Sequence, residues 1–85
     1  MPFDVVLMPQ ARGDLATAVH QDDRRAVQAR INRLTTNQTS TPLDGLGALR
    51  YVTAVNGRYR VVIMVKEAAE KVVVVGLSRN PRARP

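Results

Sequence analysis

The sequence contains no cysteine, no tryptophan and a single histidine. Without cysteine the chain forms neither disulfide bonds nor thiolate metal sites, and one histidine excludes a metal site built from several imidazoles. We therefore expect no metal and no cofactor. Aromatic residues make up only 4% of the chain, so the core must be built from Val, Leu, Ile and Ala.

Long apolar runs are also missing. The longest ones are short and rich in β-branched residues, far below the roughly 20 residues that a membrane-spanning helix needs. The first ten residues, MPFDVVLMPQ, contain Asp4 and no basic segment ahead of the apolar stretch, unlike a secretory signal peptide. We expect a cytoplasmic protein with no membrane association.

What the chain has in excess is arginine. It carries 13 basic residues against 7 acidic ones, a formal net charge of +6. Eleven of the basic residues are arginine, and most of the excess lies in residues 43–85. Arginine suits bidentate contacts with phosphate, so this imbalance favours a polyanion or an acidic protein as partner.

The length of 85 residues allows one small domain, which buries about 60–65% of the surface of its unfolded chain. We place this domain at residues 1–79 and interpret 80–85, which include Arg82 and Arg84, as a basic flexible tail with non-specific affinity for phosphate.

The first half of the chain predicts one strand and two helices. FDVVLM, residues 3–8, is typical of a buried strand, and Pro9 can begin a helix over residues 9–20. Asp22 is a candidate N-cap of a second helix, whose core face is formed by Val27, Ile31 and Leu34 at helical spacing. The polar residues 35–42 then predict a loop, and residues 44–47 predict a turn.

The second half alternates with a period of two. Asn56-Gly57 is the strongest short hairpin signal, because both residues tolerate positive φ. It separates a strand that begins near residue 48 from one over 58–65, and a last strand follows at 71–78. Tyr51 and Tyr59 are expected to be core residues with solvated hydroxyls.

These elements predict an α+β fold of order β-α-α-β-β-β, a mostly antiparallel four-stranded sheet with two helices packed on one face. The other face stays partly open. If Tyr59 faces the helices, alternation puts Arg58 and Arg60 on the open face. We expect Arg50, across the hairpin, to lie there too.

This order of elements, the opening MPQARGDL, the strand GRYRVVIMV and the last strand KVVVVGL together resemble the RelE/ParE superfamily of bacterial toxins. The resemblance covers roughly residues 3–79. It implies the fold just described, a cognate antitoxin that is expected to be acidic, and one of two targets. RelE-type members cut messenger RNA on the ribosome without a metal, whereas ParE-type members poison DNA gyrase.

By this resemblance Arg60 matches the family's arginine in the strand after the hairpin, and Arg50 falls near the basic residues of the preceding strand. Arg79 follows Ser78, where the family often has a basic residue. Arg60, Arg50 and Arg79 are thus the candidate catalytic residues, and Arg58, Arg82 and Arg84 are candidate RNA-binding residues. The family's tyrosine or histidine near the C-terminus has no counterpart in RNPRARP.

The favoured hypothesis is a RelE-like, ribosome-dependent endoribonuclease that blocks translation, with Arg60 binding the scissile phosphate. Arginine stabilises developing charge but stays protonated, so the general base and acid are not identified. A ParE-like gyrase inhibitor, and a non-catalytic member that binds only antitoxin or RNA, remain as alternatives.

Overall fold

The computed structural model describes residues 2–43 and 47–81. The elements follow the order β1 (Asp4–Leu7), α1 (Pro9–Thr17), η1 (Gln21–Asp23), α2 (Arg24–Asn32), η2 (Arg33–Thr35), β2 (Thr41–Pro42), β3 (Leu49–Ala54), β4 (Tyr59–Lys66) and β5 (Lys71–Arg79), where η1 and η2 are single 3₁₀ turns. Among these residues no helix is long and apolar enough to cross a membrane.

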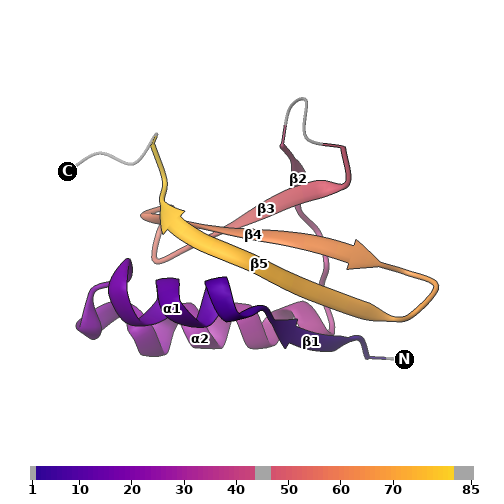
Figure 1. Ribbon diagram of the computed structural model, residues 1–85, viewed down its shortest axis with the longest axis horizontal. Coiled ribbons are helices and arrows are strands. Elements are labelled where there is room, and N and C mark those ends of the chain that lie inside the picture. The colour runs from indigo at the N-terminus through magenta and orange to yellow at the C-terminus, as the bar shows by residue number, and fades with distance from the viewer. Residues whose placement is uncertain (1, 44–46, 82–85) are drawn as a thin grey trace.

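The sheet has five strands in the order β1-β5-β4-β3-β2. β1 runs parallel to β5, and the other neighbouring strands are antiparallel. Both helices lie on one side of the sheet (Figure 1). The predicted α+β fold is therefore confirmed, with one addition. The predicted loop contains β2, a two-residue strand that pairs with Arg50 and Tyr51, while most of the predicted turn at 44–47 lies outside the described residues.

The core forms between the helices and the inner face of the sheet. Val27, Ile31 and Leu34 are fully buried, as their spacing predicts. The other buried residues of the core are Ala11, Val19, Val52, Ala54, Tyr59, Val61, Ile63, Val72, Val74 and Leu77. Because Tyr59, Val61 and Ile63 of β4 belong to this set, the residues between them must point to the opposite face.

The β3–β4 hairpin turns at Asn56-Gly57, as predicted. The N–H of Arg58 donates to the carbonyl of Val55 at 3.1 Å, and Asn56 and Gly57 have φ of 55° and 84°, the signs that a type I′ turn requires. Asn80 holds the end of β5 against this turn, because its N–H donates to the carbonyl of Arg58 and its Nδ2 donates to that of Gly57.

Helix α1 is tied to the sheet by Asp14. Its Oδ2 accepts a hydrogen bond from the N–H of Leu77 at 3.0 Å, beyond the point where β1 ends its pairing with β5. A Cβ at the neighbouring Gly76 would lie 3.1 Å from that oxygen, so the glycine permits the close approach. The side chain of Asp14 thus replaces a neighbouring strand as acceptor at this edge of β5.

The short links around the helices differ from the sequence expectation. Asp22 does not cap α2. Instead, Nδ1 of His20 accepts from the N–H of Asp22 at 3.2 Å and caps η1, the turn that precedes α2. Arg24 then reaches back, and its guanidinium donates to the carbonyls of Ala16 and Val19. A cation at the C-terminal end of α1 is favourable because that end carries partial negative charge.

Candidate functional site

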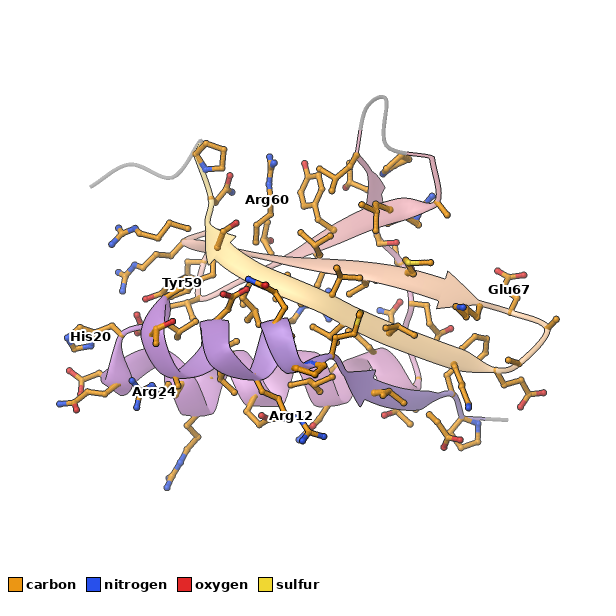
Figure 2. All side chains as sticks on the ribbon, in the orientation of Figure 1. Arg12, His20, Arg24, Tyr59, Arg60 and Glu67 are labelled. Atoms are coloured by element: carbon orange, nitrogen blue, oxygen red, sulfur yellow. The ribbon has the colours of Figure 1, made fainter. Side chains whose placement is uncertain are left out.

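Arg60 lies on the face of the sheet that the helices leave uncovered. Its neighbours in β4, Tyr59 and Val61, are buried against the helices, so alternation turns Arg60 the other way. Figure 2 shows its side chain extending from the sheet away from the helices. Arg60 pairs with Thr53 of β3 and with Ser78 of β5, which therefore lie on the same face.

We call this surface the open face and define it by seven residues of β3, β4 and β5. They form a polar row across the three strands, Thr53, Arg60 and Ser78, beside an apolar region made of Tyr51, Val62, Met64 and Val73. The four apolar residues are half-buried. The three strands contain no Asp or Glu, so no carboxylate within them can neutralise the arginine.

The guanidinium of Arg60 is held by an aromatic ring. Its Cζ lies 4.1 Å from the centroid of the Tyr51 ring, within the range of a cation–π interaction. Its Nε is buried and has no hydrogen-bond partner among the described residues. An ion pair in the same part of the chain joins Arg58 to Asp23. Arg60 is therefore a half-buried cation without an anionic partner in the described chain.

Positive charge continues along the open face toward the other hairpin. Lys66 pairs with Lys71 at the far end of β4 and β5, and the alternation that exposes Arg60, Val62 and Met64 places Lys66 on the same side. Six residues of strand separate Arg60 from Lys66, which corresponds to about 20 Å. A polyanion lying along β4 can contact both ends.

Arg50 does not lie on the open face, contrary to the sequence expectation. It pairs with Ile63, a fully buried residue, so both side chains point to the helix side. There its Nε and Nη2 donate to Oγ and the carbonyl of Ser40, each at 2.6 Å. The expectation was wrong because even-numbered residues of β4 pair with odd-numbered residues of β3. The partners of Arg60 and Val62 are Thr53 and Tyr51.

Arg58 is likewise engaged elsewhere. It lies in the hairpin turn, and its Nη1 donates to Oδ2 of Asp23 at 3.1 Å. The hydroxyl of Tyr59 donates to the same oxygen at 2.7 Å and accepts from the N–H of His20 at 3.1 Å. The predicted solvated hydroxyl of Tyr59 is thus hydrogen-bonded within the protein.

The same contacts stabilise the ionised form of Asp23. The hydrogen bond from Tyr59 lowers the pKa of Asp23 below its ordinary value; partial burial opposes this effect, and Arg58 lowers the pKa further. This cluster joins the turn before α2 to the β3–β4 hairpin, on the helix side of the sheet.

Arg79 is exposed at the end of β5 and pairs with Tyr59. Cross-strand partners share a face, so Arg79 starts on the helix side, whereas Ser78 lies on the open face beside Arg60. Arg82 and Arg84 fall outside the described residues. Of the four candidate arginines within the described chain, Arg60 alone lies on the open face.

The two residues that complete the polar row, Thr53 and Ser78, and the ring that holds Arg60, Tyr51, were not identified from the sequence as site candidates. Tyr51 was predicted to be a core residue, and the structure places it half-exposed on the opposite side of the sheet. The signal was present in the hairpin. Once Asn56-Gly57 is fixed as the two-residue turn, the register assigns Tyr51 and Thr53 to the face of Arg60.

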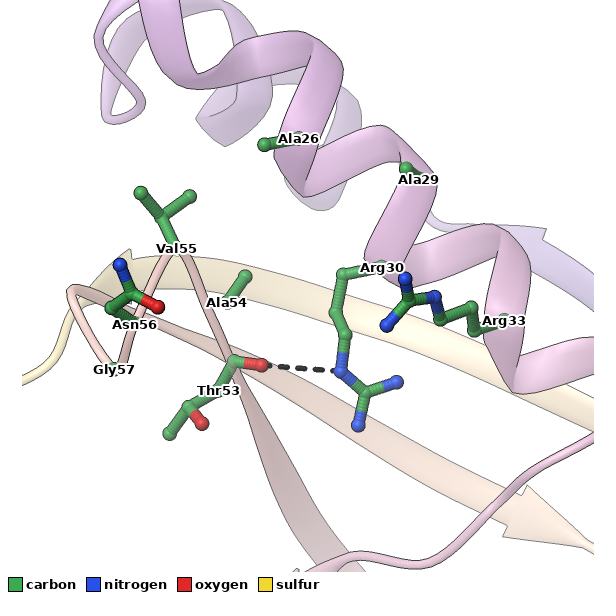
Figure 3. Close-up of a pocket in the computed structure, with 9 residues that line it drawn as sticks. All are labelled: Ala26, Ala29, Arg30, Arg33, Thr53, Ala54, Val55, Asn56 and Gly57. Carbon is green, nitrogen blue, oxygen red and sulfur yellow. Dashed lines mark hydrogen bonds between the residues drawn. The ribbon is translucent and has the colours of Figure 1, made fainter.

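A groove of about 390 Å³ runs between α2 and the outer edge of the hairpin (Figure 3). β2 pairs with Arg50 and Tyr51 of β3 but does not reach Thr53, so the carbonyl of Thr53 has no partner in β2. Nε of Arg30 donates to this carbonyl at 3.2 Å, and Arg33 lines the groove beside it. Arg30 therefore takes the place of a strand at this edge, and the groove adjoins the open face at Thr53.

Comparison with known proteins identifies the fold. No family model and no curated protein matches the sequence. Among solved structures, a chain of the toxin–antitoxin complex RelBE2 from Mycobacterium tuberculosis is 22% identical with a TM-score of 0.79, over 93% of this chain and 92% of that chain. The isolated RelE toxin of E. coli is 13% identical with a TM-score of 0.71, over 96% and 88% of the two chains.

A chain of the ParDE toxin–antitoxin system of Pseudomonas aeruginosa is also similar, with 12% identity and a TM-score of 0.71 over 91% of this chain and 95% of that chain. The protein thus has the fold shared by RelE and ParE toxin structures, which confirms the predicted resemblance at the level of the fold. The RelE-type structures have TM-scores of 0.71 to 0.79 and the ParDE chain has one of 0.71. At identities of 12–22% this likeness shows the fold and does not separate the two targets.

Proposed function

We propose that this protein is the toxin of a toxin–antitoxin module and acts, like RelE, as a metal-free endoribonuclease on messenger RNA at the ribosome. The observation that carries this proposal is Arg60: a half-buried guanidinium without an anionic partner among the described residues, on strands that contain no acid. Keeping an unpaired charge half-buried costs stability, and a phosphate ligand supplies the missing partner.

The open face suits a single-stranded nucleic acid. Arg60 binds a backbone phosphate, and the hydroxyls of Thr53 and Ser78 lie on either side of it in the polar row. The apolar region beside the row offers Val62 and Met64 to unstacked bases, whose faces pack on apolar side chains. In a duplex these base faces are already stacked, so the arrangement favours single strands.

For cleavage, the ribose 2′-hydroxyl attacks the adjacent phosphorus, the bond to the 5′-oxygen of the next nucleotide breaks, and a cyclic phosphate results. Arg60 stabilises the negative charge that develops on the phosphorane oxygens. A guanidinium neither removes the hydroxyl proton nor protonates the leaving oxygen at cellular pH. Other groups of the ribosomal complex must therefore carry out these two proton transfers.

A ParE-like gyrase inhibitor is the second candidate. It is favoured by the positions of Arg50 and Arg58, which are bound to Ser40 and Asp23 and leave the open face with fewer cations than a phosphate-cleaving site would use. For a gyrase inhibitor, the apolar region around Arg60 would contact the surface of gyrase. A non-catalytic member that binds only RNA or antitoxin is the third candidate.

The proposed partner is an acidic antitoxin. The net charge of +6 favours an acidic protein, and the similar structures include the RelBE2 complex and the intact RelBE complex of E. coli. An antitoxin that covers the open face would supply the carboxylate that Arg60 lacks among the described residues, and would exclude RNA from the same surface.

The three candidates are separated by inducing the protein in a bacterial host while transcript ends and gyrase-linked DNA breaks are followed. Cleaved transcripts with intact DNA support the RelE-like function. DNA breaks with intact transcripts support the ParE-like function. Unaffected growth with neither signal leaves the non-catalytic role.

Arg60→Ala tests the site itself. We expect loss of toxicity with little change in folding, because the Arg60 side chain makes no hydrogen bond at Nε and no ion pair among the described residues. The matched control is Arg12→Ala, which removes the same charge from the side of α1 that points away from the sheet (Figure 2) and should leave toxicity unchanged. A folded, fully toxic Arg60→Ala variant would remove Arg60 from the site.

A further inference from the structure

The contact between Tyr51 and Arg60 is not imposed by the backbone. Tyr51 pairs with Val62, and Arg60 pairs with Thr53, so the two residues are diagonal neighbours whose backbones are about 7–8 Å apart. The Arg60 side chain must lean along the sheet to bring its guanidinium to 4.1 Å from the ring centroid. This orientation leaves Nε buried and unpartnered among the described residues, which is unfavourable unless the orientation serves another contact.

Stacking on a ring and binding an anion use different parts of a guanidinium. The cation–π contact uses the face of the planar group, whereas its N–H donors point outward in the plane. Tyr51 can therefore hold the group while the terminal nitrogens remain directed at a ligand. A long arginine side chain that is already ordered loses less freedom when it binds.

We propose that Tyr51 is the positioning residue for Arg60, and that its aromatic ring, rather than its hydroxyl, fixes the guanidinium in the orientation that binds phosphate. This inference rests on the proposed function, in which the open face binds single-stranded RNA. It assigns Tyr51 an effect that is transmitted only through Arg60. A Tyr51 that merely packs on Val62 would change stability without any dependence on Arg60.

The test measures the affinity of the purified full chain for a fluorescein-labelled single-stranded RNA hexamer. Tyr51→Phe keeps the ring and should bind like the original protein. Tyr51→Val keeps a residue that favours strands but removes the ring, and should weaken binding about two- to fivefold, the range of an exposed to partly desolvated cation–π contact. Tyr51→Leu serves in its place if the valine variant does not fold.

The decisive measurement is the affinity of the double variant Tyr51→Val/Arg60→Ala for the same RNA hexamer. Since Tyr51 acts through Arg60, this variant should bind no more weakly than Arg60→Ala alone. As a readout independent of activity, the Nε–H resonance of Arg60 should lose its ring-current shift in Tyr51→Val and keep it in Tyr51→Phe.

Two failures are distinguishable. If Arg60→Ala binds the hexamer as well as the original protein, the proposed RNA-binding function and this inference both fail. If Arg60→Ala weakens binding but Tyr51→Val does not, or if the two effects add in the double variant, the proposed function stands and the positioning role of Tyr51 is wrong.

Discussion

Arg50 and Arg60 lie on adjacent strands and have opposite surroundings, so replacing each by alanine should have opposite consequences. Arg50 makes two hydrogen bonds of 2.6 Å to Ser40 and thereby holds the segment that leads into β2 against β3. Taking about 1 kcal/mol for each bond, Arg50→Ala should lower the free energy of unfolding by about 2 kcal/mol. For a domain of this size that corresponds to a fall in Tm of about 8–16 °C.

Arg60→Ala should have the reverse profile. It loses the stacking on Tyr51, about 0.5–1 kcal/mol, and also removes a half-buried unpartnered Nε, which offsets part of that loss. We expect a change in Tm of a few degrees at most. Affinity for single-stranded RNA should fall about ten- to a hundredfold, because a charged contact with phosphate is worth about 1.5–3 kcal/mol, and the slope of log K against log salt should fall by about 0.7.

The assay is therefore a pair of measurements on each variant: thermal unfolding followed by circular dichroism, and RNA affinity at several salt concentrations. Arg50→Ala should bind RNA with an unchanged salt slope at a temperature where it is fully folded. If Arg50→Ala instead keeps its Tm and loses affinity or toxicity, then Arg50 acts in the site from the helix side. The assignment of roles by strand register would in that case be refuted.

Three further perturbations test the contacts that place the site. Asp14→Ala leaves the N–H of Leu77 without its acceptor and should lower the free energy of unfolding, measured in urea, by about 1–3 kcal/mol. An Asp14→Asn variant keeps a side-chain oxygen as acceptor. If it is no more stable than Asp14→Ala, the hydrogen-bond explanation is contradicted. Gly57→Ala forces a side chain to φ 84° and should cost about 1–2 kcal/mol, whereas the same change at Gly13, which has open space around its Cβ position, should stabilise α1 by up to about 1 kcal/mol. Because the pKa of Asp23 is lowered in the folded state, chiefly by Tyr59, its contribution to stability is present above the unfolded pKa of about 3.9 and is lost as the pH falls through the folded value. Unfolding curves at pH 7, 4 and 3 should show part of the acid destabilisation disappear in Asp23→Asn; an identical pH profile for the two proteins would exclude Asp23 as its source.

The sequence predicted most of the fold because its local signals agree with one another. Val27, Ile31 and Leu34 repeat at helical spacing and are all buried, and Asn56-Gly57 forms the expected turn. β2 was missed because two residues, one of them proline, carry no periodicity. Its existence depends on the edge of β3, a tertiary contact that no local pattern encodes.

The site was predicted less well, for a geometric reason. Arg60 was identified and lies on the expected face, but a one-residue error in the assumed pairing exchanges the two sides of a strand. That error moved Arg50 to the open face and moved Tyr51 into the core. The partners of Arg58 also could not be inferred, since Asp23 reaches it from an element more than thirty positions earlier in the chain.

The parallel pairing of β1 with β5 has a consequence for biosynthesis. It joins the first strand of the chain to the last, a contact of very long sequence separation, and Arg60 has its neighbour Ser78 on that same last strand. During translation β1 and both helices emerge first, and β1 cannot pair with the rest of the sheet until β5 has left the ribosome exit tunnel. A nascent chain whose β5 has not yet emerged therefore lacks Ser78 beside Arg60 and carries no complete open face.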